Sequence, residues 1–155
     1  MLQACYSDHD LRWMNQALAL ARQAETCGEV PVGAVVVYQN EIIGQGYNQV
    51  ISTHDASAHA EIVALRDAGR KIGNYRLLEA SLYVTLEPCA MCATALMHAR
   101  LKHLIFGALD PKAGAITSRD QLLARDYFNH RVKWRGGVMS ESCGGVLSEF
   151  FKKRR

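Results

Sequence analysis

The sequence contains no long apolar run. Its longest, residues 30–38, is about half of the roughly 18–20 residues that a membrane-spanning helix needs, and it includes Pro31 and Gly33. The first ten residues, MLQACYSDHD, lack the basic stretch followed by an apolar stretch that marks a secretory signal. Internal repeats, low-complexity tracts and linker-like segments are also absent. We therefore expect a cytoplasmic protein that does not enter a membrane.

Composition, length, charge and cysteine count narrow the class of protein further. With 49% apolar and 21% charged residues, the composition is globular and excludes a disordered or fibrous chain. A length of 155 residues suits one compact domain spanning residues 1–155. The net charge of +3 only weakly suggests a polyanionic partner. Five cysteines cannot all pair, and in the cytosol a C-x-x-C pair is more often a metal or redox site than a disulfide.

Helix-like and strand-like patterns alternate along the chain. Ser7 and Asp10 have capping-box spacing before a helical period that ends near Gly28. Strands are expected at 34–38, 41–47, 81–86, 103–108 and, as a short edge strand, 132–134; helices are expected at 58–68, 89–99 and 140–151, with Gly69 ending the first of these. The first two strands form an antiparallel hairpin, whereas a helical crossover makes the 81–86 and 103–108 strands parallel. The pattern predicts an α/β layered fold with a mixed sheet.

Two short segments carry groups suited to binding a metal, HAE at 59–61 and PCAMC at 88–92. Cys89 and Cys92 are three residues apart and share one helix face. A helix N-terminus favours the thiolate form, and thiolates with an imidazole suit zinc. We therefore predict that His59, Cys89 and Cys92 bind one Zn²⁺ ion per subunit. Three protein ligands leave one tetrahedral position for water, as in catalytic rather than structural zinc sites.

Glu61 is predicted to move protons beside this metal. Zinc acidifies its water, Glu61 takes the proton, and the carboxyl group then returns protons to the ring nitrogen of a base and to the leaving ammonia. Taken singly, the same residues have ordinary explanations: His59 as a core histidine, C-x-x-C as a stray or redox pair, and Glu61 as a solvated helix charge. Their combination as H-x-E followed by P-C-x-x-C favours the metal site.

The same motifs carry a resemblance to a known family. H-x-E with P-C-x-x-C is the signature of zinc nucleobase deaminases. Further stretches, such as EVPVGAV from Glu29, HDASAHAE from His54, LYVTLEPCAMCA from Leu82 and FGALD from Phe106, resemble the bacterial tRNA-specific adenosine deaminases over nearly the whole chain. The resemblance implies conversion of adenosine to inosine at the wobble position (position 34) of tRNA anticodons. Zinc-activated water would attack C6, with Glu61 as the proton shuttle.

The resemblance also implies a fold and partners. The expected fold is the three-layer α/β/α cytidine-deaminase-like fold with a five-stranded mixed sheet. The expected assembly is a homodimer with each site completed near the interface, and the expected partner is the tRNA anticodon stem-loop. Matching positions imply that Asn48 hydrogen-bonds the flipped nucleoside, and that Asp110 and Lys112 contact the nucleotides beside it.

The end of the chain supplies candidate RNA contacts. Phe150 could stack on a base, and the basic residues Lys152, Lys153, Arg154 and Arg155 could hold phosphates. The alternative is that Phe150 and Phe151 pack the final helix and that the basic end is simply solvated.

Two other functions remain open at this point. A small-molecule deaminase acting on cytosine, cytidine, deoxycytidylate or guanine would use the same metal site. A non-catalytic zinc module is disfavoured by Glu61, since a structural site needs no such carboxylate. The roles of Cys5, Cys27 and Cys143 are left open.

Overall fold

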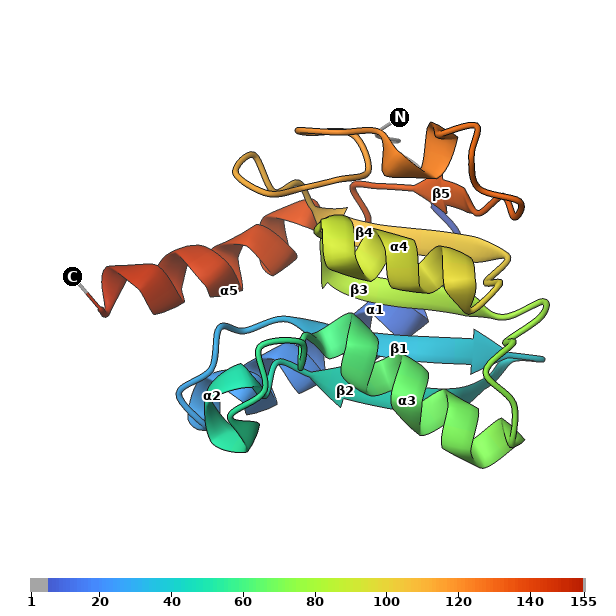
Figure 1. Cartoon of the computed structure of the whole chain (residues 1–155). Helices are drawn as coiled ribbons and strands as arrows, with labels where there is room; N and C mark the ends of the chain where they lie inside the picture. The colour runs from blue at the N-terminus through green and yellow to red at the C-terminus, as the bar shows by residue number, and fades with distance from the viewer. Residues whose placement is uncertain (1–5, 155) are drawn as a thin grey trace.

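The computed structural model describes residues 6–154, and it begins with the long helix α1 (Asp8–Thr26) (Figure 1). The Ser7 side chain accepts a hydrogen bond from the Asp10 backbone N–H at 3.1 Å, and the Asp10 carboxylate accepts one from the Ser7 backbone N–H at 3.4 Å, so the predicted capping box is confirmed. Gly28 follows the helix with a φ of 76°, a left-handed conformation that glycine adopts without steric cost. The predicted stop near Gly28 is therefore also confirmed.

A five-stranded mixed sheet forms the middle of the molecule. Its strands are β1 (Gly33–Tyr38), β2 (Glu41–Tyr47), β3 (Ser81–Leu86), β4 (His103–Ala108) and β5 (Lys133–Arg135). They lie in the order β2-β1-β3-β4-β5. β1 is antiparallel to β2 and β3 is parallel to β4, as the hairpin and the helical crossover predicted. In addition, β1 is antiparallel to β3 and β4 is parallel to β5.

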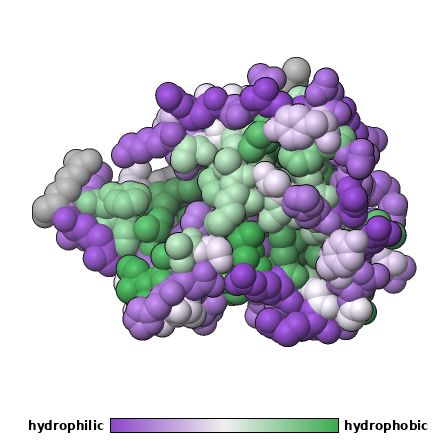
Figure 2. Space-filling model, in the orientation of Figure 1, coloured by the Kyte–Doolittle hydropathy of each residue, from purple (hydrophilic) through white to green (hydrophobic). Residues whose placement is uncertain are grey.

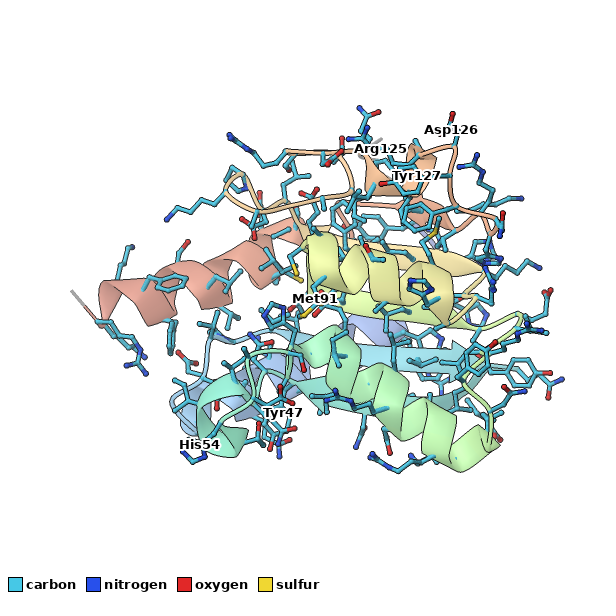
Figure 3. All side chains as sticks on the ribbon, viewed as in Figure 1. Tyr47, His54, Met91, Arg125, Asp126 and Tyr127 are labelled. Atoms are coloured by element: carbon cyan, nitrogen blue, oxygen red, sulfur yellow. The ribbon has the colours of Figure 1, made fainter. Side chains whose placement is uncertain are left out.

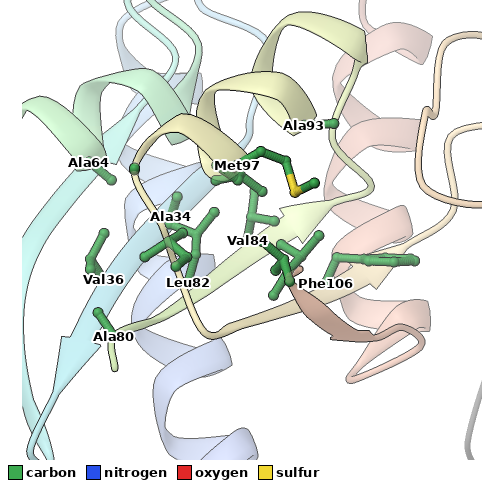
Figure 4. Packing of buried hydrophobic residues seen from close by; sticks show 14 of the residues in the cluster. Ala34, Val36, Ala64, Ala80, Leu82, Val84, Ala93, Met97 and Phe106 are labelled. Atoms are coloured by element: carbon green, nitrogen blue, oxygen red, sulfur yellow. The ribbon is translucent and has the colours of Figure 1, made fainter. Parts of the chain in front are cut away.

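Helices cover both faces of the sheet (Figure 1). α3 (Ala60–Ile72) and α4 (Ala90–His98) lie on one face, and α1 and α5 (Ser140–Lys152) on the other. Figure 4 shows the core beneath α3 and α4, where Leu82 and Val84 of β3 lie under the small residues Ala64 and Ala93. The arrangement confirms the predicted three-layer α/β/α fold with a five-stranded mixed sheet.

Two glycines in β2 let α3 rest directly on the strand. A Cβ atom at Gly44 would lie 2.5 Å from the carbonyl oxygen of Ala64, and one at Gly46 would lie 2.6 Å from the Ala64 backbone nitrogen. Any side chain at these positions would push the helix away. The position of α3, which begins beside His59 and carries Glu61, therefore depends on these two glycines.

Three local expectations were incomplete or wrong. Gly69 does not end α3; the helix continues to Ile72 and ends at Gly73, whose φ of 74° suits a left-handed cap. A glycine inside a helix costs only about 1 kcal/mol, so packing on β2 outweighs it. Two short elements were not expected, α2 (Val50–Thr53) and the 3-10 turn η1 (Leu122–Ala124).

A last feature of the fold concerns membranes. Within residues 6–154, no helix combines the length and apolar character needed to cross a membrane.

Candidate metal centre and active site

The three predicted metal ligands meet where α3 and α4 begin, and the N-terminal ends of these helices lie side by side (Figure 1). His59 and Cys89 are the N-cap residues, one position before the first helical turn in which they were expected, and both have extended backbone. Neither side chain makes the usual capping hydrogen bond, so both are available to a metal. Cys92 joins them from the first turn of α4 and is fully buried.

The distances between these side chains fit a tetrahedral metal ion. His59 Nδ1 lies 3.6 Å from the Cys89 sulfur and 3.5 Å from the Cys92 sulfur, and the three ligand atoms all lie within 4.8 Å of one another. Tetrahedral zinc with Zn–S near 2.3 Å and Zn–N near 2.0–2.1 Å separates nitrogen from sulfur by about 3.6 Å. The three residues can therefore hold one metal ion, and their soft sulfur and imidazole donors match zinc.

The surroundings of the two thiols favour ionisation of Cys89 and oppose that of Cys92. A hydrogen bond from Cys92, with further help from His59, lowers the pKa of Cys89 to about 4. The same hydrogen bond, together with burial, raises the pKa of Cys92. The hydrogen bond to Cys89 also raises the pKa of His59. The pair thus shares one proton, which must leave when both sulfurs coordinate a cation.

No fourth protein ligand completes the site within the described part of the chain. His54 ends α2 and is exposed, and its side chain points away from the two helix ends (Figure 3). Cys143 is buried in the core cluster on the opposite face of the sheet, and Cys27 is exposed. Cys5 lies outside the described residues. A three-ligand set is the pattern of catalytic zinc sites.

Glu61 lies in the first turn of α3 and is buried, with 4% of its surface exposed. Burial raises the pKa of Glu61 to about 7; the negative charge of Cys89 adds to the increase, and His59 opposes it. A carboxyl group with a pKa near neutrality can both accept and donate a proton at physiological pH. This is the chemical property that the predicted proton shuttle requires.

Asn48 lies next to the start of α3. Its side-chain oxygen accepts a hydrogen bond from the Ala60 backbone N–H at 2.8 Å, and its amide donates to the Val30 carbonyl at 3.1 Å. Asn48 thus caps α3 in place of His59, whose imidazole is directed to the metal site. One amide N–H of Asn48 remains free of these bonds, since a side-chain amide has two.

Asp110 and Lys112 occupy the segment that follows β4. The Asp110 carboxylate accepts hydrogen bonds from the backbone N–H groups of Lys112 and Ala113 at 3.0 and 3.2 Å, which forms a tight turn. Lys112 is exposed and Asp110 is half-buried. The structure therefore fixes the backbone of this segment and leaves the Lys112 side chain in solvent.

Sequence reasoning missed two buried carboxylates beside the site, Glu29 and Glu87. Glu29 accepts hydrogen bonds from the Ile51 and Ser52 backbone N–H groups at 3.1 and 2.8 Å, which fixes α2. Burial would raise the pKa of Glu87, but hydrogen bonds led by those of Ser118 lower it instead. For Glu87, the only sequence signal was its place as an acidic residue at the end of a mostly apolar strand pattern, directly before Pro88.

The predicted RNA-contacting end differs in one respect from expectation. Phe150 is 5% exposed, and the Arg154 guanidinium lies 4.2 Å from its ring centroid, so this ring has no free face for a base. Phe151 is 48% exposed and meets Phe150 edge-on. Lys152 and Lys153 are exposed at the end of α5, while Arg155 lies outside the described residues.

Comparison with known proteins identifies the relatives of this chain. The family model of the MafB19-like deaminases matches residues 8–155. A tRNA-specific adenosine deaminase of Haemophilus influenzae is 51% identical over 96% of this chain and 87% of its own length. A structure solved in a study of A-to-I editing by tRNA:A34 deaminases at the wobble position of transfer RNA has a TM-score of 0.86 and 39% identity, and the match covers 88% of this chain and 99% of that one.

A guanine deaminase from Nitrosomonas europaea has a TM-score of 0.77 at 22% identity, covering 97% of this chain and 87% of its own; at that identity the likeness concerns the fold alone. The fold thus recurs in both solved structures. With half of its residues identical to the Haemophilus protein over nearly the full length, the chain belongs to the tRNA-specific adenosine deaminase family, within the MafB19-like deaminases.

Proposed function

We propose that this protein converts adenosine to inosine at position 34 of tRNA anticodons, and that the chain 1–155 does so as one domain in the cytoplasm. The observation that supports this most directly is the three-ligand metal site with buried Glu61 in a chain half identical to an adenosine deaminase of tRNA. The resident metal in this proposal is one zinc ion per subunit, held by His59, Cys89 and Cys92. When bound, zinc supplies a Lewis acid that acidifies a water molecule.

The residues of the chain then divide the remaining tasks. The reaction replaces the C6 amino group of adenine by the oxygen of one water and releases ammonia. Glu61 accepts a proton from the attacking water and gives it to the ring nitrogen N1. It then takes the remaining water proton from the new C6 hydroxyl group and transfers it to the departing amine, which leaves as ammonia while the C6 carbonyl forms. The free amide N–H of Asn48 binds the nucleoside extruded from the anticodon loop.

Other residues hold the nucleotides on either side of the extruded nucleoside. Asp110 and Lys112 contact the nucleotides flanking position 34. Lys152 and Lys153 contact phosphates from the end of α5, which extends beyond the ends of the strands (Figure 1). Phe151, the exposed ring of the aromatic pair, is better placed to stack on a base than Phe150.

We also propose that two copies form a homodimer through the face made by α3 and α4. Figure 2 shows apolar side chains gathered in the middle of this face, with hydrophilic side chains above and below them. A groove there is lined by Leu65, Tyr75, Ala95 and His98, and Met91 is 38% exposed nearby (Figure 3). Since α3 and α4 both begin at the metal site, a second copy on this face would lie close to it. Sedimentation should give a particle of twice the chain mass; a monomer at micromolar concentration would contradict this part.

The function is tested with purified, zinc-loaded protein. We expect inosine in an anticodon stem-loop with adenosine at the wobble position, and no inosine when adenosine is moved to another loop position. Free cytidine, deoxycytidylate and guanine are offered under the same conditions as the alternative substrates. Deamination of a free base without inosine in the RNA would favour the small-molecule deaminase. If activity persisted after chelation of the zinc, both deaminase hypotheses would be contradicted.

A further inference from the structure

The segment between β3 and α4 carries a buried carboxylate that binds no metal. Glu87 is 1% exposed and stands two residues before Cys89. Its backbone N–H donates to the Ala108 carbonyl at 2.8 Å, which continues the parallel pairing of β3 with β4 by one residue. The backbone of Glu87 is therefore as firmly placed as the sheet, and its side chain projects from a fixed base.

The Glu87 carboxylate gathers both ends of one loop, residues 110–118, which we call the 110–118 loop. One oxygen accepts the Asp110 backbone N–H at 3.0 Å and the Ser118 hydroxyl. The other accepts the backbone N–H groups of Ile116, Thr117 and Ser118 at 3.1, 2.8 and 3.0 Å. Five donors separated from Glu87 by 23 to 31 residues thus converge on one side chain.

The loop is shaped around this carboxylate. Converging backbone N–H groups form the kind of concavity that binds phosphates and other anions in many proteins, and here a side chain of the chain itself fills it. A Cβ atom at Gly114 would lie 2.3 Å from both the Glu87 carboxyl carbon and one of its oxygens, so only glycine allows the approach. The Ala115 backbone N–H also donates to the Pro88 carbonyl at 2.8 Å.

The 110–118 loop is thereby joined to the residues that lead into α4. Pro88 and Cys89 follow Glu87 directly, and the loop begins with Asp110 and Lys112. We infer that Glu87 is a positioning residue that fixes the 110–118 loop at a set distance from the metal site, so that the groups that contact the substrate are in position before the RNA binds. The part concerning RNA rests on the proposed function; the hold on the loop does not.

The test variant is Glu87→Gln, which keeps the size of the side chain but replaces one acceptor oxygen by an amide that faces N–H donors. We expect amide hydrogen exchange at 110 and 116–118 to accelerate at least tenfold. We also expect zinc content to stay at that of the wild type. In the stem-loop assay, kcat/KM should fall at least tenfold, mainly through a higher KM, because the reacting groups stay in place while the loop loses its preorganisation.

Two further variants separate positioning from loss of stability. Asp10→Asn also removes a buried carboxylate, but Asp10 lies in α1 on the other face of the sheet. It should lower the melting temperature while leaving KM and the exchange of the 110–118 amides unchanged. Gly114→Ala should reproduce the Glu87→Gln phenotype. Since both substitutions break the same contact, the double variant should be no more impaired than the more severely impaired of the two single variants.

Wild-type exchange rates at 110 and 116–118 in Glu87→Gln and Gly114→Ala would overturn the inference. Faster exchange with unchanged KM would overturn its catalytic part. A wild-type protein that makes no inosine would instead contradict the proposed function, and the exchange measurements would still decide what Glu87 does.

Discussion

Glu61 differs from the other buried carboxylates in its surroundings. Asp10, Glu29 and Glu87 accept hydrogen bonds from N–H or O–H donors, and the pKa of each is lowered although burial opposes the shift. Glu61 lies among the metal-binding side chains, and its pKa is raised. Environments that push the pKa values of similar groups apart often distinguish acid–base catalysts from structural groups.

The first prediction at this scale concerns Glu61→Gln. The variant should keep one zinc ion per chain, because Glu61 is not among the three ligands, and should lose about 10²–10⁴-fold in turnover, the usual contribution of a general acid–base. Inosine formation and zinc content measured on the same preparation check this. Normal turnover in a zinc-loaded variant would remove Glu61 from the mechanism.

The second concerns the cluster of Asp10, Tyr83 and Arg135, which joins α1 to β3 and β5. The Tyr83 hydroxyl donates to Asp10 at 2.8 Å, and the two terminal guanidinium nitrogens of Arg135, Nη1 and Nη2, donate to the same carboxylate. Asp10→Asn should lower the free energy of unfolding by about 2 kcal/mol, near the lower end for a charged hydrogen-bonded group because Arg135 is partly exposed.

The same cluster sets a pH dependence. Burial opposes ionisation of Asp10, but the hydrogen bonds from Arg135 and Tyr83 outweigh it and lower its pKa. The stabilisation is therefore complete above the unfolded value of about 3.9 and is lost as the pH falls through the folded value. Urea unfolding at pH 7 and at pH 3 or below should show the gap between wild type and Asp10→Asn closing at the acid end. A constant gap would show that the charge of Asp10 is not what stabilises the fold.

At the scale of secondary structure, the contact of β2 with α3 yields the next prediction. Gly46→Ala should lower the free energy of unfolding by about 1–3 kcal/mol, the usual cost of overpacking, and should weaken zinc binding because α3 follows directly from His59. Gly145→Ala is the matched control, since nothing lies within 4 Å of a Cβ there. Because Gly145 lies within α5, Gly145→Ala should raise the free energy of unfolding slightly. Equal effects of the two substitutions in chemical denaturation would contradict this account.

Elements with local signals were predictable from the sequence, and those held by distant partners were not. The spacing within 59–61 and 88–92 was enough to predict the ligand set that the structure brings together. α2 escaped prediction because Glu29, 22 residues before Ile51, supplies its acceptor. The hold of Glu87 on the 110–118 loop escaped for the same reason. Gly69 was misjudged as a stop because the glycine that ends α3, Gly73, comes four residues later.

At the scale of the whole molecule, the proposed RNA contacts predict a strong salt dependence. For a single-stranded loop, the logarithm of the affinity falls with the logarithm of the salt concentration, with a slope of about 0.7 per phosphate contact. Replacing Lys152 and Lys153 by glutamine should therefore reduce the slope by up to about 1.4. Arg154 is left unchanged in this test, because it donates a hydrogen bond to the Gly28 carbonyl at 3.2 Å and covers the Phe150 ring. Fluorescence anisotropy over a salt series measures the slope, and an unchanged slope would place the RNA away from α5.

Glu29 and Glu87 have a consequence for how this architecture can diversify. Both accept hydrogen bonds mainly from backbone N–H groups, which every amino acid except proline possesses; Glu87 additionally accepts the Ser118 hydroxyl. Exposed positions such as Lys112 and Thr117 can therefore mutate freely without dislodging the main chain that bears them. One scaffold can thus acquire new base preferences by exchanging outward-facing groups while its chemical machinery is inherited intact.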